Sequence, residues 1–315
     1  MTSLEHRHDI VFLFDVANDA ANAALDNSNL PALAHERNPS FISNLAIKRA
    51  ICRYTENKSP GPNFRTLVRD EQRSGSDGAD ALDRDVTQHM ISAARAPRRP
   101  PTLDEHRPLI QFLCRQFFDV RAFGATLGEG PHILQLRGPV QITFASSVDP
   151  VVPLDNPTKD RFRTYGLYRM HLFISPNLAS KTGFGQADLD HLLTALAGMF
   201  ELTNGKGKGR ITSRRIIIFR HESGLGCAPA QTLFDRVRIE RENIVPPEPE
   251  IGSPARRFED YDIAVHASDL PAGIEMKDLR CERLEDAQRT VRSNLEVLPL
   301  RQRLGMTSGS IQRPA

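Results

Sequence analysis

The chain has 315 residues, of which 39% are hydrophobic, so it can bury a sizeable core in one large domain or two modest ones. No apolar run approaches the length that a bilayer requires, and the N-terminus is polar where a signal peptide would be apolar, so we expect a soluble protein of the cytoplasm. The net charge of +2 neither requires nor excludes a nucleic-acid partner, which leaves the local clustering of basic residues to decide.

The N-terminal part predicts a strand, a loop and an amphipathic helix. Residues 10–14 are a short apolar run of strand-forming residues, which suits a central strand covered on both faces. Residues 18–40 lack sustained periodicity and predict a long loop, and the next helix begins near Ser43. Its predicted buried stripe comprises Ile47, Ala50, Ile51 and Tyr54, and its basic face comprises Lys48, Arg49 and Arg53.

The middle of the chain predicts an insertion followed by a helix and two strands. Residues from about 57 to 107 are dominated by Pro, Gly, Ser, Arg and Asp, which indicates a protruding insertion with one short helix at 86–94. A second helix is expected over 108–118. Alternation of apolar and polar residues then predicts half-buried strands at 140–144 and 168–174.

The C-terminal part completes an α+β pattern. We expect an amphipathic helix over 189–200, a buried strand at 216–219, a stiff linker at 246–254 and a further strand at 261–266. The order strand, helix, strand, strand, helix, strand is typical of a ferredoxin-like or RRM-like sheet. We therefore predict that residues 1–280 form a single RRM-like palm with the insertion at about 57–107, and that residues 281–315 form an extension whose end is disordered.

The basic helix face is the first candidate for a functional surface. A loop that leads into a helix start at Ser43 and Asn44 offers backbone N–H groups to a phosphate, and Lys48, Arg49 and Arg53 extend that site along the helix. The alternative is the solvated face of an ordinary amphipathic helix.

Two further segments suit a nucleic acid. Lys206, Lys208 and Arg210 alternate with glycines between a predicted helix and strand, so this segment can wrap a phosphodiester backbone or can be a mobile, soluble connector. Arg121 and Phe123 lie on the same side of the chain if it is extended, where an arginine and an aromatic ring together suit a nucleotide. The alternative is that Phe123 belongs to the core.

Nothing in the sequence argues positively for catalysis. His6 and His8 lack the helical spacing of a metal site, and His221 and Glu222 have no second carboxylate or histidine at a telling spacing. No Walker sequence, dinucleotide fingerprint or nucleophile elbow is present. We therefore expect no enzyme activity, no metal and no cofactor. The cysteines, which are too far apart for metal-ligand spacing and are expected to be reduced, are Cys52, Cys114, Cys227 and Cys281.

A series of motifs covers most of residues 7–275. The principal motifs, in chain order, are residues 7–16, 45–54, 117–124, 137–144, 164–169, 181–184 and 219–223, and those at 226–230, 233–235 and 257–261 extend the series. Their sequences and order resemble the Cas-seven family, the backbone subunits of type I Cascade, and most closely the type I-C branch.

The resemblance implies a right-hand-shaped subunit with an RRM-like palm and an inserted finger region. Several copies line up along one CRISPR RNA beside other Cascade subunits and hold its spacer for pairing with target DNA. In the family, the loop and basic helix after the first strand contact the RNA. With the segments described above, the candidate RNA-binding residues are Asn22, Ser43, Asn44, Lys48, Arg49, Arg53, Arg121, Phe123, Arg137, Lys206, Lys208, Arg210, Arg220 and His221.

Two segments depart from the family pattern. Residues 19–26 replace the Asn-Pro-Asn-Gly-Asp-Pro-like loop of the type I-C relatives, and the link from Asp149 to Tyr165 is short where relatives have a thumb hairpin. Two other functions stay open. One is a metal-dependent RNA nuclease on the same palm that uses His221, Glu222 or Asp15, and the other is a stand-alone RNA-binding regulator.

Overall fold

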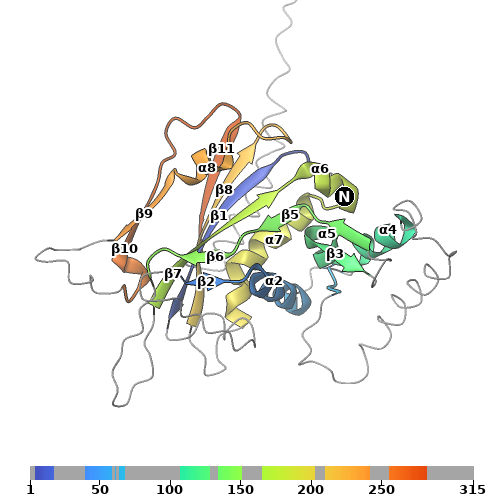
Figure 1. Cartoon of the computed structure of the whole chain (residues 1–315), viewed down its shortest axis with the longest axis horizontal. Coiled ribbons are helices and arrows are strands. Elements are labelled where there is room, and N and C mark those ends of the chain that lie inside the picture. The colour runs from blue at the N-terminus through green and yellow to red at the C-terminus, as the bar shows by residue number, and fades with distance from the viewer. Residues whose placement is uncertain are drawn as a thin grey trace, which may run out of the picture.

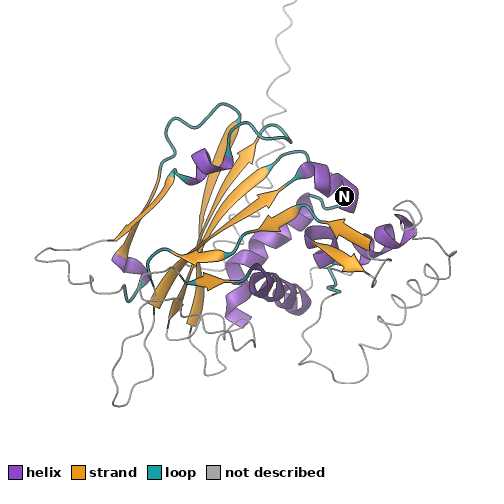
Figure 2. Ribbon diagram, viewed as in Figure 1, coloured by secondary structure: helices purple, strands orange, loops and turns teal. Residues whose placement is uncertain are grey.

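A central antiparallel sheet organises the computed structural model (Figures 1 and 2). The structure describes residues 4–17, 40–58, 61, 64–67, 107–127, 134–150, 165–202, 210–241 and 255–281. The predictions for the long loop, the helix at 86–94, the linker at 246–254 and the end of the C-terminal extension lie outside these residues.

The sheet has seven strands in the order β11-β8-β1-β7-β6-β2, and β5 also pairs with β7. Every pair is antiparallel, and β1 lies between β7 and β8 along its whole length. The strands are β1 (His8–Ala17), β2 (Phe41–Ile42), β5 (Val140–Ile142), β6 (Ala145–Ser147), β7 (Tyr165–Ile174), β8 (Arg210–His221) and β11 (Ile274–Arg280).

Helices cover one face of this sheet. They are α2 (Asn44–Lys58), α7 (Gln186–Gly198) and the short η3 (Met199–Leu202). Because side chains alternate along a strand, Ile10, Phe12 and Phe14 of β1 point into the same core as the buried residues of both helices. The main hydrophobic core therefore lies between β1, β7, β8 and the two helices.

The opposite face of the sheet has its own, smaller core. Val11 and Leu13 of β1 pack here with Phe219 of β8 against Leu233 and Phe234. The covering elements are α8 (Ala230–Phe234), η4 (Phe258–Asp260) and the pair of strands β9 (Val237–Arg241) and β10 (Tyr261–Val265). Both faces of β1 are therefore buried, as its continuous apolar run predicts.

A third group of elements flanks the helical face. It contains α4 (Arg107–Gln116), α5 (Phe118–Phe123), α6 (Pro176–Thr182) and a two-stranded sheet of β3 (Gly124–Leu127) and β4 (Leu134–Arg137). The turn from α5 into β3 depends on Gly124, which has a φ of 82°, and on Gly138, where an added Cβ would lie 2.4 Å from the carbonyl oxygen of Ala122. These two glycines let the β3–β4 pair lie against the end of α5.

The predicted order of strand, helix, strand, strand, helix and strand is confirmed as β1, α2, β5, β7, α7 and β8. The mixed helix and antiparallel-sheet class is confirmed with it, whereas the RRM-like description and the domain limits stay predictions. The strand at 261–266 is confirmed as β10. Among the helices of the described residues, none is long and apolar enough to cross a membrane.

One predicted helix is confirmed, but the segment after it differs from the prediction. The helix predicted over 108–118 is α4, which ends at Gln116, whereas the segment after Phe117 forms a separate helix, α5, that the sequence did not predict. The strand predicted at 140–144 ends at Ile142, and Phe144 is 59% exposed between β5 and β6.

Candidate nucleic-acid interface

Helix α2 has a defined start against the sheet. The backbone N–H of Ala46 donates to Ser43 Oγ at 3.1 Å, and Asn44 Nδ2 donates to the carbonyl oxygen of Ile142 at 3.4 Å. Ser43 is thus the N-cap of α2. Its hydroxyl oxygen already accepts one of the backbone N–H groups that the sequence analysis proposed for a phosphate. The bond from Asn44 ties the same turn to β5 and fixes the direction of the helix.

The two faces of α2 have the predicted orientation. All four residues of the predicted stripe are buried in the main core, including Ile47 and Ile51. Arg49 is exposed, and Lys48 and Arg53 are partly exposed on the other side of the helix. The cationic side chains therefore reach the surface while the helix is held by its apolar stripe.

The structure brings Phe123 and Arg137 to this basic face. Lys48 Nζ lies 5.3 Å from the centre of the Phe123 ring, a cation–π contact between α2 and the end of α5. Partial burial of the amine lowers the pKa of Lys48 below its ordinary value. Gly124, the next residue after Phe123, pairs in register with Arg137 of β4, whose side chain is exposed. Phe123 thus joins the basic face of α2, and Arg137 is exposed on the strand that pairs with the residue after it.

Exposed apolar side chains surround the start of α2. Phe41 is 50% exposed, Leu45 is 48% exposed, and Phe144 is more exposed than either. Ile42 of β2 and Ala145 of β6 are register partners. Phe41 and Leu45 lie within three residues of Ile42 in the chain, and Phe144 directly precedes Ala145, so the pairing brings the three segments together. Large apolar groups beside cations suit the bases of a single strand, which stack on apolar surfaces while phosphates meet the charges. Sequence reasoning missed these residues, because a lone apolar residue in a strand pattern indicates core.

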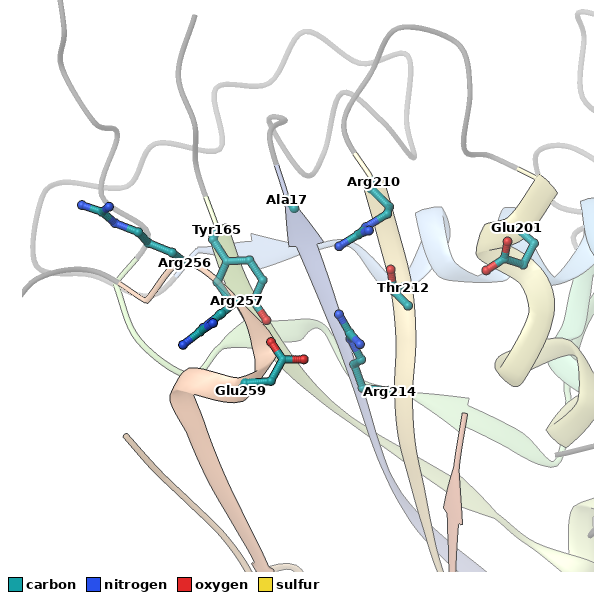
Figure 3. Close-up of a pocket in the computed structure, with 9 residues that line it drawn as sticks. All are labelled: Ala17, Tyr165, Glu201, Arg210, Thr212, Arg214, Arg256, Arg257 and Glu259. Carbon is teal, nitrogen blue, oxygen red and sulfur yellow. The ribbon is translucent and has the colours of Figure 1, made fainter. Parts of the chain in front are cut away.

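A second basic region is a pocket of about 420 Å³ where three strands of the sheet begin or end (Figure 3). Ala17 ends β1, Tyr165 begins β7 and Arg210 begins β8. Four arginines and two glutamates line the pocket. Its lining residues are Ala17, Tyr165, Glu201, Arg210, Thr212, Arg214, Arg256, Arg257 and Glu259.

Buried Asp15 fixes the orientation of one arginine in this pocket. Arg214 Nε and Nη2 donate to Asp15 Oδ2 at 2.8 and 2.6 Å, and the Tyr165 hydroxyl donates to the same oxygen at 3.0 Å. The guanidinium also lies 4.7 Å from the centre of the Phe258 ring. Burial, and then the nearby Asp15 carboxylate, raises the pKa of Tyr165. Tyr165 therefore stays a protonated hydrogen-bond donor, and the Arg214 side chain is held from two sides.

Arg121 is inside the protein, in contrast to the RNA contact that the sequence predicts. Its guanidinium is 2% exposed, with Nη2 2.6 Å from Asp188 Oδ1 and Nη1 donating to the carbonyl oxygen of Cys114 at 2.7 Å. The prediction assumed an extended segment, whereas α5 is helical and turns Arg121 and Phe123 to different sides. Arg121 thus has a buried partner in place of a phosphate.

His221 is also internal. Its Nδ1 accepts the backbone N–H of Cys227 at 2.9 Å, so its Nε2–H donates to Asp9 Oδ2 at 3.0 Å. Burial lowers the pKa of His221, and its side chain is fully enclosed, so the predicted RNA contact is replaced by a pair within the protein. The neighbouring Arg220 is partly exposed and forms an ion pair of 2.8 Å with Glu275 across β8 and β11.

The remaining candidates are divided between the surface and the part of the chain that is not described. Arg210 is exposed at the pocket, whereas Asn22, Lys206 and Lys208 lie outside the described residues. Within the described ranges, no group of three or more His, Cys, Asp or Glu side chains is arranged to hold a metal ion.

Comparison with known proteins gives one family. The family model described as CRISPR-associated protein Cas7 matches residues 6–164 and 157–266. Two solved structures are similar in part. A chain of a "CRISPR RNA-guided surveillance complex, pre-nicking" is 16% identical with a TM-score of 0.37, and one of a "CRISPR RNA-guided surveillance complex" is 13% identical with a TM-score of 0.32. Each alignment covers 68% of this chain and 75% of the other. No curated protein matches.

Proposed function

Because this chain belongs to the family of CRISPR-associated protein Cas7, we propose that it is a repeating backbone subunit of a Cascade-type effector. In this role it binds the CRISPR RNA, contacts further copies of itself and other Cascade subunits, and presents the spacer for pairing with target DNA in the cytoplasm. The type I-C branch, which the sequence motifs resemble, is part of the same proposal.

The observation that carries the proposal is the basic surface of α2 with its two additions from α5 and β4. Lys48 and Arg49 stand on the side of the helix opposite its buried stripe, and Arg137 is exposed nearby on the β3–β4 pair. Contacts of this kind bind phosphates and position a strand without reading its sequence. A subunit that leaves the reading of sequence to base pairing needs this type of surface.

We propose binding in preference to RNA cleavage. Asp15, one candidate group for a nuclease, is held by Arg214 and Tyr165, and His221, another, is held by Asp9. Both side chains thus have internal structural partners. Incubation of the protein with labelled repeat RNA in magnesium or manganese tests this point, and cleavage that is abolished by Asp15→Asn or Glu222→Gln would establish the nuclease instead.

The test of RNA binding is the salt dependence of affinity for a labelled single-stranded RNA. We expect the wild-type protein to bind several sequences about equally, with an affinity that falls steeply as salt rises. The double variant Lys48→Ala/Arg49→Ala should weaken binding to every sequence and lower the slope of log K against log salt by about 0.7 per lost phosphate contact.

The matched control for this experiment is Arg238→Ala, which removes one exposed arginine from β9, away from α2. It should leave both the affinity and the salt slope unchanged. An α2 double variant that binds as the wild type does would show that the basic face is only solvated and would remove the main physical support for the proposal.

A further inference from the structure

The arginine pocket at the end of the sheet is a second site that could receive an anion. It is lined from both sides of the sheet end: Arg210 and Arg214 come from β8, and Arg256, Arg257 and Glu259 come from the segment that enters η4 (Figure 3). Glu201 lines it from η3, which packs against α2. One lining residue thus belongs to an element that contacts α2, and none of the lining residues belongs to α2 itself.

The pocket presents arginine side chains that can donate hydrogen bonds to an anionic ligand. Arg214 is paired with Asp15, and Arg257 is paired with Asp260 at 3.0 Å. Within the described part of the chain, Arg210 and Arg256 have no ion-pair partner, and both are exposed at the pocket. Glu201 and Glu259 also line the pocket and offset this charge, so an anion would be held by the guanidinium N–H donors of Arg210 and Arg256 and not by a surplus of positive charge.

The fixed arginine gives the pocket the character of a built site. Asp15 is 1% exposed and accepts both donors of Arg214, while the Phe258 ring lies against the guanidinium. Because the guanidinium is held from the side of Nε and Nη2, it loses little conformational freedom when Nη1 meets a ligand. A volume of about 420 Å³ lies within the range of small-ligand pockets and can hold one nucleotide unit.

We infer that this pocket binds a phosphate group of the RNA strand, as a second contact separate from the basic face of α2. The inference rests on the proposed function for the identity of the strand. The guanidinium groups of Arg210 and Arg256, which have no ion-pair partner among the described residues, can each donate two parallel hydrogen bonds to phosphate oxygens, and Nη1 of Arg214 can add a third contact.

The experiment compares four proteins in the same RNA titration: the wild type, Arg210→Ala/Arg256→Ala, Lys48→Ala/Arg49→Ala and the control Arg238→Ala. The pocket variant should weaken binding and lower the salt slope by about 0.7 for each lost contact, as the α2 variant does. Its melting temperature should stay at the wild-type value, because both removed side chains are exposed and have no ion-pair partner among the described residues. The Arg238→Ala protein should match the wild type.

A second arm distinguishes a strand phosphate from a free anion. Inorganic phosphate and uridine monophosphate are added separately, and the shift in melting temperature is measured for the wild type and the pocket variant. If either probe stabilises only the wild type while RNA binding is equal in both, the pocket takes a free anion and the inference is overturned. It is also overturned if the pocket variant matches the Arg238→Ala control in every titration. Failure of the wild type to bind RNA refutes the proposed function instead.

Discussion

Arg121→Ala should destabilise the protein without a specific effect on RNA. The guanidinium donates to Asp188 through the Nε–H, which is shared between Oδ1 and Oδ2 at 3.1 Å each, and through Nη2, which lies 2.6 Å from Oδ1, and both side chains are enclosed. Removal of Arg121 leaves a buried carboxylate whose described partner is the backbone N–H of Gly185 at 2.9 Å. Loss of one partner of a buried ion pair typically costs about 3–5 kcal/mol.

The assay is urea unfolding of Arg121→Ala beside Arg238→Ala, whose exposed side chain should change stability by less than about 0.5 kcal/mol. The double variant Arg121→Met/Asp188→Leu removes both charges and should recover most of the loss, less about 1 kcal/mol for the cap that Asp188 provides at the start of α7. RNA affinity of the folded fraction should be unchanged. Wild-type stability of Arg121→Ala together with weaker RNA binding would refute the buried pair and restore the RNA contact that the sequence predicts.

Three further predictions follow from the fold and the candidate interface. Ile51→Ala should lower the free energy of unfolding in urea by about 2–5 kcal/mol because the side chain is fully buried. The folded fraction should keep its RNA affinity, and a loss of affinity without a loss of stability would contradict this. Because the chain has no tryptophan, Phe144→Trp gives a single reporter whose fluorescence RNA should quench by stacking, whereas Leu225→Trp, at a 79% exposed position, should be unaffected. Stability should fall as the pH drops from 6.5 toward 4, because two buried histidines and one partly buried histidine have pKa values lowered from 6.5 to about 4 and the unfolded chain takes up protons first. A flat profile over this range in urea unfolding would contradict it. Burial is the main cause of each shift, and the histidines are His8, His171 and His191.

The elements of the fold were predictable where the signal is local. The stripe of Ile47 and Ile51 at helical spacing identifies α2 because each turn repeats the same contact with the core. The apolar run at 10–14 identifies β1 because burial on both faces leaves no polar alternation. The basic face of α2 follows from the same periodicity, since whatever lies opposite a buried stripe meets solvent.

The parts that sequence reasoning missed depend on long-range pairing. Asp188 follows Arg121 by 67 residues, and nothing in the α5 segment indicates that this arginine has an internal partner. The pocket exists because the register of β1, β7 and β8 brings three strand ends together, with Asp15 and Arg214 joined across 199 residues. In the sequence, the glycine- and lysine-rich segment at 205–210 was the local sign of a basic site at the pocket. Of that segment, the structure describes Arg210 alone.

The most direct test of a repeating, RNA-bound backbone subunit is the mass of the complexes that the purified protein forms on single-stranded RNAs of increasing length. Head-to-tail contacts that do not close continue along a shared strand, and each bound copy raises the local concentration of the next. The proposed function predicts that the mass rises stepwise with RNA length while the free chain stays small. One bound subunit at every RNA length would contradict it.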